Sequence, residues 1–410
     1  MSRRLDHIDL SCVKAGEKRV GGSVRLGYRE MKEIIYADNA ATAALDPVAL
    51  EAMLPWLTSD RGNASQPHLS GQRAREAVER ARETVSGLIG ASPDEIVFTS
   101  GGTESDNWAI RGFAPDVCKR RIIASAVEHH AVLYACREAA VESSVETAVE
   151  TVPVDSSGVV AGDALSALLN REDSIPTLVS VMLANNETGT VEPIKKLAGT
   201  ARTNGAFFHT DAVAAAGKIP IDVGDLGVDM LSASAHKFGG PQGVGFLYIK
   251  KGTPIRPLLF GGSQERLMRA GTENVAGIVG AAAALKSRCD KMRQTSDRLI
   301  RLEKRLLAGL RGADYIRNGA ENHVPGLVCL SFRGADGETI LHRLDLKGIA
   351  ISTGAACDSV RTRTSHVIDA IGVPAEYANG TVRISFGESN TEEEADRIAE
   401  ELLAVVKNTL

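Results

Sequence analysis

The chain has 410 residues, 43% of them hydrophobic, which is enough to bury a large core and to form two domains. Its formal net charge of -5 gives no electrostatic reason to expect broad binding to nucleic acid or to anionic membranes. No apolar run is long enough to span a bilayer, and the six cysteines are scattered without a CxxC pair. We therefore expect a soluble protein of a reducing cytoplasm, without a disulfide framework and without a metal site.

The N-terminal stretch differs from the rest of the chain. It lacks apolar periodicity and the apolar segment of a signal peptide, and strand-like sequence begins only at Lys32-Glu33-Ile34-Ile35-Tyr36. We expect residues 1–31 to form a disordered extension that folding and activity do not require.

Helical patterns follow. Pro47 is placed to begin a helix after Asp46, and a long amphipathic helix is predicted from about Gly71 to Ile89, closed by Gly90. The apolar run 95–99 then predicts a strand that leads into Ser100-Gly101-Gly102-Thr103-Glu104-Ser105. Such a turn, opening a helix, can bind a phosphate through backbone N–H groups, although a plain strand-to-helix turn with a threonine cap fits it equally.

Strands continue to alternate with helices, at 121–125, 178–183, 206–210 and 228–232. Each of these apolar runs ends in polar residues, among them His129, Asn186 and Asp211. The alternation predicts an α/β fold with one mostly parallel sheet and helices on both faces. Such sheets bind ligands at the carboxyl ends of their strands, where these polar residues fall.

Lys237 follows the last of these strands in a turn rich in glycine, before a further strand at 246–249. A desolvated lysine amine loses its proton easily and can form a Schiff base, although an ordinary loop lysine fits the same position. Asp211 could pair with a protonated ring nitrogen, and His129 could stack on a ring. With the glycine turn at 100–105, these residues meet the requirements of pyridoxal phosphate.

Six segments then show a resemblance to a known family. They are Tyr36-Ala37-Asp38-Asn39-Ala40-Ala41-Thr42, Thr99-Ser100-Gly101-Gly102-Thr103-Glu104-Ser105, Glu128-His129, Asn185-Asn186-Glu187-Thr188-Gly189, His209-Thr210-Asp211-Ala212 and Ser234-Ala235-His236-Lys237. In order and from about Lys32 onward, the chain resembles the pyridoxal-phosphate-dependent cysteine desulfurases of the longer-loop NifS- and IscS-like group. The resemblance implies fold type I, with a large sheet domain (47–290), a small α+β domain (291–410) joined by residues 32–46, and a homodimer with its active sites at the subunit interface.

The resemblance also implies roles for individual residues. Lys237 would be the Schiff-base lysine, Asp211 the partner of the ring nitrogen, and His129 the stacking and acid-base residue. The remaining cofactor-binding positions would be Gly102, Thr103, Asn186, Ser234, His236 and, from the second subunit, Thr272. The substrate carboxylate would be held by Arg383, with Asn63 and Asn186 nearby; a guanidinium matches a carboxylate plane well.

The C-terminal third contains a predicted helix near 296–310 and Thr391-Glu392-Glu393-Glu394, which predicts a capping box before a final helix. Cys357 lies in a loop of small residues, where a thiol is accessible, whereas the helical surroundings of Cys118 and Cys136 suggest core positions. In the resembled family this loop cysteine carries a persulfide.

The implied reaction converts L-cysteine to L-alanine and passes the sulfur to an acceptor protein. Iron–sulfur assembly, tRNA thiolation and DNA phosphorothioation all draw on the family. In the DNA case the desulfurase would supply sulfur to partner proteins and would not need to bind DNA itself, and we expect no direct binding of nucleic acid. One position departs from the pattern: Ala214 stands where the family has a glutamine that donates to the phenolic oxygen of the cofactor. Two alternatives stay open, a related fold-type-I lyase or aminotransferase that needs no thiol at 357, and a scaffold whose cofactor site has decayed.

Overall fold

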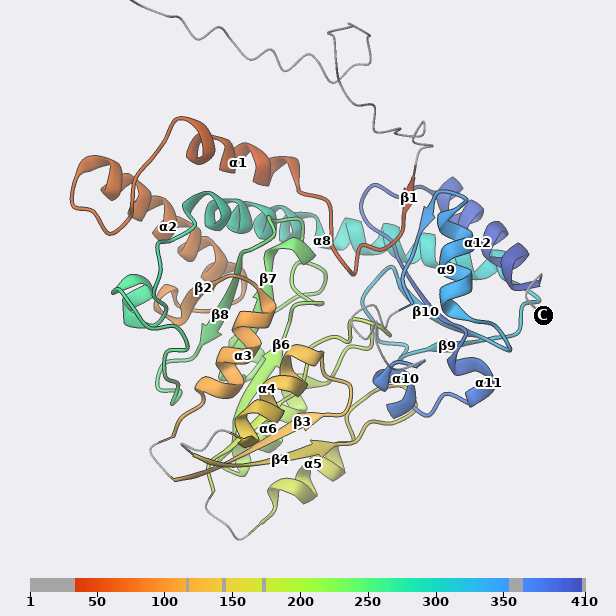
Figure 1. The fold of residues 1–410 in the computed structure, drawn as a ribbon, viewed down its shortest axis with the longest axis horizontal. Helices are drawn as coiled ribbons and strands as arrows, with labels where there is room; N and C mark the ends of the chain where they lie inside the picture. Colours follow the sequence, from red (N-terminus) through yellow and green to blue (C-terminus); the bar gives the residue numbers. More distant parts are fainter. Residues whose placement is uncertain (1–33, 116–117, 142–144, 172–174, 354–363, 408–410) are drawn as a thin grey trace, which may run out of the picture. The chain divides into compact units, whose positions relative to one another are not determined.

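A seven-stranded sheet forms the centre of the computed structural model, which describes residues 34–115, 118–141, 145–171, 175–353 and 364–407 (Figure 1). The strands lie in the order β2-β8-β7-β6-β5-β3-β4. β8 is antiparallel to both of its neighbours, and all other pairs are parallel, so the predicted mostly parallel sheet is confirmed. The strands span Ile96–Thr99 (β2), Lys119–Ser125 (β3), Glu146–Val152 (β4), Thr177–Ser180 (β5), Phe207–Asp211 (β6), Met230–Ser234 (β7) and Gly245–Ile249 (β8).

Helices cover both faces of this sheet, because neighbouring residues of a strand point to opposite sides. Val97 packs with α3 (Gly102–Gly112) and α4 (His130–Val141) on one face. Phe98 packs on the other face, in a core shared with α2 (Leu69–Leu88), α5 (Gly162–Leu169) and α6 (Ile194–Thr203). Because both faces are buried, β5 and β7 are apolar-rich strands without an exposed residue.

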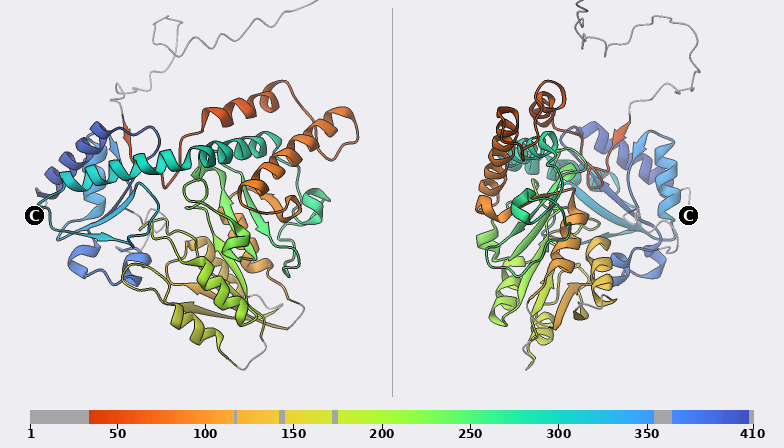
Figure 2. Two further views of the ribbon diagram at one scale, coloured as in Figure 1. Left: turned by 180° about the vertical axis from the view of Figure 1, so that it is seen from behind. Right: turned by 60° about the vertical axis from the view of Figure 1, so that its left-hand side comes forward.

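The long helix α8 (Val275–Gly309) belongs to two hydrophobic cores, and it runs from the first sheet to a second one (Figures 1 and 2). Ile278 and Leu285, in its first half, pack into the core beside the seven-stranded sheet. Leu299 and Leu306, in its second half, pack into a separate core. The sequence predicted only the second half of this helix.

The second core lies on a three-stranded antiparallel sheet in the order β12-β10-β9. Beside it, the short strand β1 (Ile35–Tyr36) pairs in parallel with β11 (Ile349–Ala350), which brings the first described segment next to the last third of the chain. The remaining elements of this part are β9 (Tyr315–Asn318), β10 (Leu327–Phe332), β12 (Thr381–Ser385), α9 (Gly337–Asp345), α10 (His366–Ala370), α11 (Ala375–Ala378) and α12 (Glu392–Lys407).

Local signals at helix ends are confirmed. Asp46 caps α1 (Pro47–Thr58) by accepting a hydrogen bond from the Val48 backbone at 2.9 Å. Thr391 and Glu394 form the predicted capping box before α12, at 3.1 and 3.2 Å. The prediction for Cys118 was wrong: its side chain is exposed immediately before β3, whereas Cys136 is buried on α4 as predicted.

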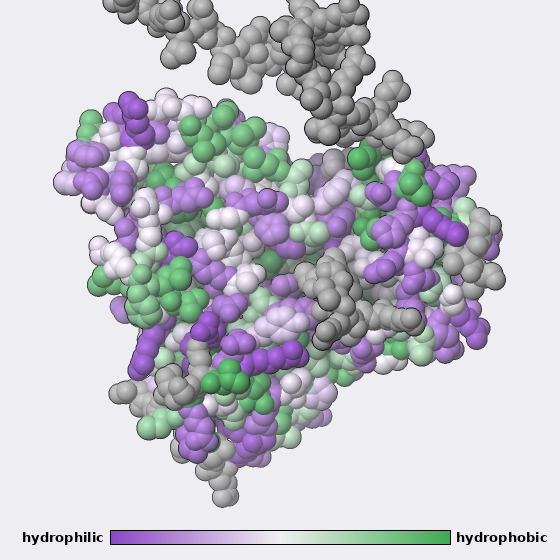
Figure 3. Space-filling model, in the orientation of Figure 1, coloured by the Kyte–Doolittle hydropathy of each residue, from purple (hydrophilic) through white to green (hydrophobic). Residues whose placement is uncertain are grey.

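The outer face of α1 is apolar. Leu50, Leu54 and Leu57 are all exposed there, and the helix forms a green patch in the space-filling view (Figure 3). Among the residues that the structure describes, no helix combines the length and the apolar character that crossing a membrane requires.

Candidate active site

A cavity of about 510 Å³ lies at the carboxyl ends of the parallel strands. It collects most of the residues that the sequence singled out, although they come from distant segments of the chain. Its walls include Gly102, Thr103, His129, Asn186, Asp211, Ser234, His236, Lys237 and Arg383. The fold therefore brings together the candidate lysine, the candidate ring partner and the glycine turn.

Lys237 ends the short helix η3 (Ala235–Lys237), directly after β7. Its ammonium donates hydrogen bonds to the backbone carbonyls of Ala40 and Ala41, at 2.8 and 2.9 Å. The chain turns sharply here, with Gly239 at a φ of +84°, a conformation that favours glycine. The turn therefore holds Lys237 at the carboxyl end of β7, where it lines the cavity.

The glycine turn before α3 lines this cavity, and Gly102 packs closely against Val213. A Cβ atom on Gly102 would lie 2.5 Å from Val213 Cγ2, so only glycine fits without a shift of its neighbours. The first backbone N–H groups of α3 face this space, and the helix dipole favours negative charge there.

Glu104 lies at the same helix end, where a free carboxylate would repel an anion. Arg269 binds it through two hydrogen bonds, at 2.9 and 3.1 Å. Burial alone would raise the pKa of Glu104, but the hydrogen bonds from Arg269 and Ser100 hold it below its ordinary value. Its charge is thus ion-paired, which keeps the turn suitable for a phosphate.

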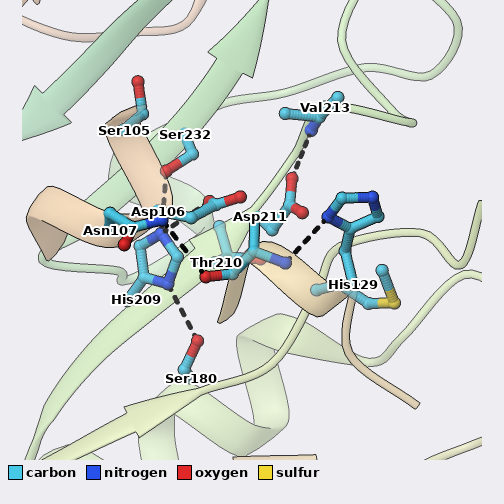
Figure 4. A network of polar contacts seen from close by, with 12 residues as sticks. Ser105, Asp106, Asn107, His129, Ser180, His209, Thr210, Asp211, Val213 and Ser232 are labelled. Atoms are coloured by element: carbon cyan, nitrogen blue, oxygen red, sulfur yellow. Dashed lines mark hydrogen bonds and ion pairs between the residues drawn. The ribbon is translucent and has the colours of Figure 1, made fainter. Parts of the chain in front are cut away.

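Asp211 ends β6 and lines the cavity, and Figure 4 shows it beside Val213. One of its oxygens accepts a hydrogen bond from the Val213 backbone at 2.8 Å. Burial raises the pKa of this carboxyl from 3.8 to about 6, against the opposing effects of that hydrogen bond and of Lys237. A cationic ring nitrogen in the cavity would stabilise its ionised form.

Behind Asp211 lies a buried polar network that the sequence did not predict (Figure 4). His209 contacts the hydroxyls of Ser180 and Ser232, at 2.9 and 3.0 Å, and lies 3.7 Å from an oxygen of Asp106. Burial lowers the pKa of His209 to about 3, so the imidazole is neutral. Burial raises the pKa of Asp106 well above its ordinary value, with Asp211 adding to the effect.

The signals for this network were present in the sequence but ambiguous. His209 interrupts an apolar strand, and Asp106 lies on the buried side of α3 next to Trp108. A polar residue inside an apolar pattern indicates either a partner or a function. Only the fold shows that both residues lie behind Asp211.

His129 faces the cavity from the turn before α4. Its Nδ1 atom accepts a hydrogen bond from the Ala131 backbone at 3.1 Å, so the proton of the neutral ring is on Nε2 (Figure 4). Burial, followed by the charges of Lys237 and His366, lowers the pKa of this histidine. A neutral His129 with one N–H group can stack on a ring and donate or accept a proton.

Arg383 on β12 reaches the same cavity and is only 4% exposed. It donates to the Asn186 carbonyl at 2.9 Å and to Asp38 at 2.7 Å. Its Nε atom is buried and has no hydrogen-bond partner among the described residues. A guanidinium held in this way has the geometry to bind a carboxylate.

Some predicted residues lie elsewhere. Asn63 uses its side-chain oxygen to accept from the Ser65 backbone at 2.9 Å and does not line the cavity, and Thr272 is exposed on a loop. Cys357 lies outside the described residues. Ala214 does line the cavity, and its methyl group cannot donate the hydrogen bond that the resembled glutamine would provide.

The loop that carries Thr272 is anchored at its base by a buried ion pair. Arg82 on α2 contacts Glu265 at 2.7 Å, and both side chains are almost fully buried. Glu265, in the short helix η4 (Gln264–Leu267), has a φ of +46°, which is strained for a residue with a side chain. The pair holds this strained segment, and Thr272 follows it.

The residues present fit pyridoxal phosphate. A lysine and a buried carboxylate share one cavity with the glycine turn at the N-terminus of α3, where a Cβ atom on Gly102 would clash with Val213. Fold and site together define a pyridoxal-phosphate enzyme of fold type I.

Comparisons with known proteins agree. The family model of the class-V aminotransferases matches residues 35–398. The cysteine desulfurase IscS of Dictyoglomus turgidum is 45% identical over 382 residues, which cover 92% of this chain and 95% of that protein. This chain belongs to the class-V aminotransferase family, and its relatives there are cysteine desulfurases of the IscS and NifS type.

Solved structures show the same fold. A NifS-like protein superposes with a TM-score of 0.84 at 39% identity, and the match covers 92% of this chain and 100% of that one. A structure of SspA in complex with cysteine superposes with a TM-score of 0.75 at 31% identity, covering 86% of this chain and 98% of that one.

Proposed function

We propose that this chain converts L-cysteine to L-alanine by means of Lys237, His129 and Cys357, and passes the sulfur to a partner protein. It is a pyridoxal-phosphate-dependent cysteine desulfurase, as the named relatives over more than nine-tenths of its length indicate. The observation that supports the residue roles most strongly is the cavity in which Lys237 and Asp211 meet the glycine turn.

Each residue would act on a defined group. Arg383 and Asn186 would hold the substrate carboxylate. Lys237 would remove the proton from the substrate Cα and return a proton to that carbon when alanine forms. His129, neutral and with its proton on Nε2, would move a proton at the substrate sulfur. Pyridoxal phosphate, when bound, supplies an aldehyde for Lys237 and an electron-withdrawing ring whose nitrogen faces Asp211.

The atoms and electrons of the sulfur transfer balance if one enzyme thiol, that of Cys357, accepts the sulfur. The Cys357 thiolate attacks the sulfur of the substrate, so that an S–S bond forms and the substrate C–S bond breaks. The electron pair of that bond goes to the substrate Cβ, which takes a proton and becomes the methyl group of alanine. The oxidised sulfur remains as a persulfide on Cys357, from which an acceptor thiol takes it.

The chain is proposed to act as a cytoplasmic homodimer. Thr272 and Asn63 do not line the cavity within one chain, and a second subunit would bring its own Thr272 to the phosphate. The exposed apolar face of α1 supports burial against a partner. The acceptor would serve iron–sulfur assembly, tRNA thiolation or DNA phosphorothioation.

We also propose two domains, with the boundaries expected from the sequence. The large domain (47–290) would hold the seven-stranded sheet, and the small domain (291–410, with 32–46) the three-stranded sheet. The separate hydrophobic cores on the two sheets and the β1–β11 pairing support this division. The two halves of α8 would then belong to different domains.

Cys357→Ser tests the role of the thiol. The variant should bind the cofactor with the absorbance of the wild type but release no sulfide from L-cysteine in the presence of a reductant. Cys136→Ser is the matched control, because Cys136 is buried on α4, and it should keep the activity. Full sulfide release by Cys357→Ser would show that another group accepts the sulfur, and loss of the cofactor would give Cys357 a structural role.

A further inference from the structure

A second, smaller cavity of about 60 Å³ also borders Lys237. Three cationic side chains line it: Lys237 from η3, Lys218 from the loop after β6, and Arg288 from α8. Glu388 is the one carboxylate among its described lining residues. The remaining wall is largely apolar, with Leu299 and Leu327 among its residues.

The partners of these cations differ. Arg288 binds Glu388 at 2.5 Å and donates to the Phe238 carbonyl at 3.1 Å. Lys237 donates to two backbone carbonyls. The Lys218 ammonium has neither a hydrogen bond nor an ion pair with any residue that the structure describes. The Glu388 carboxylate is thus already paired with Arg288, and it does not neutralise the charge of Lys218.

The neighbours of Lys218 are mainly cationic. Burial, followed by the positive charges of Lys237, Arg383 and Arg288, lowers the pKa of Lys218 to about 7. The charge of Lys218 also acts on His236: burial, then Lys237 and Lys218, lower the pKa of His236 to about 4. The charged or titratable groups around Lys218 are thus His236 and Lys237 on η3, Arg383 on β12, Arg288 on α8 and Glu388 after β12.

We propose that Lys218 is a positioning residue. It places a positive charge beside Lys237 and so lowers the proton affinity of the Lys237 nitrogen. The inference rests on the proposed function, in which Lys237 binds the cofactor aldehyde. An amine attacks an aldehyde, and accepts a proton from a substrate, only in its unprotonated form. A second ammonium in the same small, partly desolvated cavity favours that form through Coulomb repulsion.

The test is the visible absorbance of the cofactor-loaded protein as a function of pH, without substrate. Lys218→Met removes the charge and keeps an unbranched side chain, so the midpoint of the absorbance change should rise by about 1 pH unit, a tenfold change in proton affinity. Lys218→Arg carries the charge throughout the titration, so its midpoint should not rise above that of the wild type. Lys195→Met is the matched control, since Lys195 is exposed on α6 and pairs with Asp225 at 2.5 Å.

Two outcomes would overturn the inference. One is a Lys218→Met protein that binds the cofactor and keeps the midpoint of the wild type, which would mean that the Lys218 charge does not reach Lys237. The other is a Lys218→Arg midpoint that rises as far as that of Lys218→Met, which would make shape and not charge the cause. If Lys218→Met fails to fold by circular dichroism, Lys218→Gln replaces it with the same expected rise.

The failure of the proposed function would look different. If the wild type bound no cofactor, or if Lys237→Ala kept the pH-dependent chromophore of the wild type, the role of Lys237 itself would be wrong. A normal chromophore in the wild type with an unmoved midpoint in Lys218→Met would leave the function intact and remove only the role of Lys218.

Discussion

Asp106 and Asp211 are two buried carboxyls close to one another, and their surroundings affect their proton affinities differently. Asp106 is 1% exposed, and one of its oxygens has no hydrogen-bond partner among the described residues. Its neighbour His209 is neutral and offers no compensating charge. Asp211 accepts a backbone N–H and faces the cavity with Lys237. We infer that burial disfavours the charge of Asp106, whereas the Val213 N–H group and Lys237 stabilise the ionised form of Asp211.

Without the cofactor, an ionised Asp211 should destabilise the fold. Its pKa rises from 3.8 in the unfolded chain to about 6 in the folded one, so the folded state binds the proton more tightly. The free energy of unfolding therefore falls as the pH rises from about 4 to 6, and the full cost is present above pH 6. Asp211→Asn removes this charge, and the cofactor-free variant should be more stable than the wild type by roughly 2–3 kcal/mol at pH 8.

Urea unfolding of both cofactor-free proteins at pH 8 measures this difference. At pH 4, where Asp211 is protonated in the folded protein, the two stabilities should converge. The variant should also bind pyridoxal phosphate more weakly, because a neutral amide cannot stabilise a ring cation. A variant that is less stable than the wild type at pH 8 would contradict the assignment of a buried charge to Asp211.

Most of the cavity residues that the sequence predicted lie at or after the end of an apolar run, whereas Arg383 lies inside β12. Asp211 and Lys237 stand out for this reason, because a polar residue after a buried strand indicates a ligand site. Asp106, His209 and Lys218 lie inside or between regular elements, and their burial is decided by segments far away in the sequence. Pattern and the family resemblance together therefore predicted the walls of the cavity but not the charges behind it.

Gly102 opens α3 at the point where the helix meets the cavity. In Gly102→Ala the new Cβ atom would lie 2.5 Å from Val213 Cγ2, so the turn or Val213 must shift. Because Val213 also donates to Asp211, the shift would disturb both ends of the cofactor. We expect the dissociation constant for pyridoxal phosphate to rise at least about tenfold, or about 1.4 kcal/mol.

Gly199→Ala is the control for this change. Gly199 lies on α6, where a Cβ atom would meet nothing within 4 Å, so alanine should leave cofactor binding unchanged and slightly favour the helix. Titration of the cofactor-free proteins, followed by absorbance, compares the two variants. Wild-type affinity in Gly102→Ala would show that the turn has space that the structure does not indicate.

Short strands and capped helices were predictable, whereas the length of α8 was not. Its first half contains Gly277 and Gly280, which in a sequence indicate a break in a helix. In the fold they allow close packing, since Cβ atoms there would lie 2.5 Å from Val244 and Met53 side chains. The close packing of these two glycines against Val244 and Met53 explains why glycine occurs inside the helix, and the sequence does not show this packing.

One chain does not complete the proposed site, because Thr272 does not line its own cavity. If a second subunit supplies this residue, two defective chains can complement each other. Lys237→Ala lacks the lysine, and Thr272→Asp places a negative charge where the phosphate would bind. In a mixed dimer, one site has both defects and the other has none.

Co-expression of the two variants tests this arrangement. Each alone should be inactive, and random pairing should restore about a quarter of the wild-type activity, because half of the dimers would carry one intact site. Two differently tagged variants allow the mixed dimer to be purified and assayed by itself. A pure mixed dimer without activity would contradict a shared site, and a monomeric active wild type would contradict the dimer.

The central claim is that Lys237 and its cavity hold pyridoxal phosphate and that L-cysteine is the substrate. The most direct measurement is the visible spectrum of the purified protein, followed by addition of L-cysteine with a thiol reductant. The account predicts a yellow protein that releases sulfide and alanine in equal amounts. A colourless protein that cannot be loaded with the cofactor, or a yellow one that changes its spectrum with L-cysteine but releases no sulfide, would contradict it.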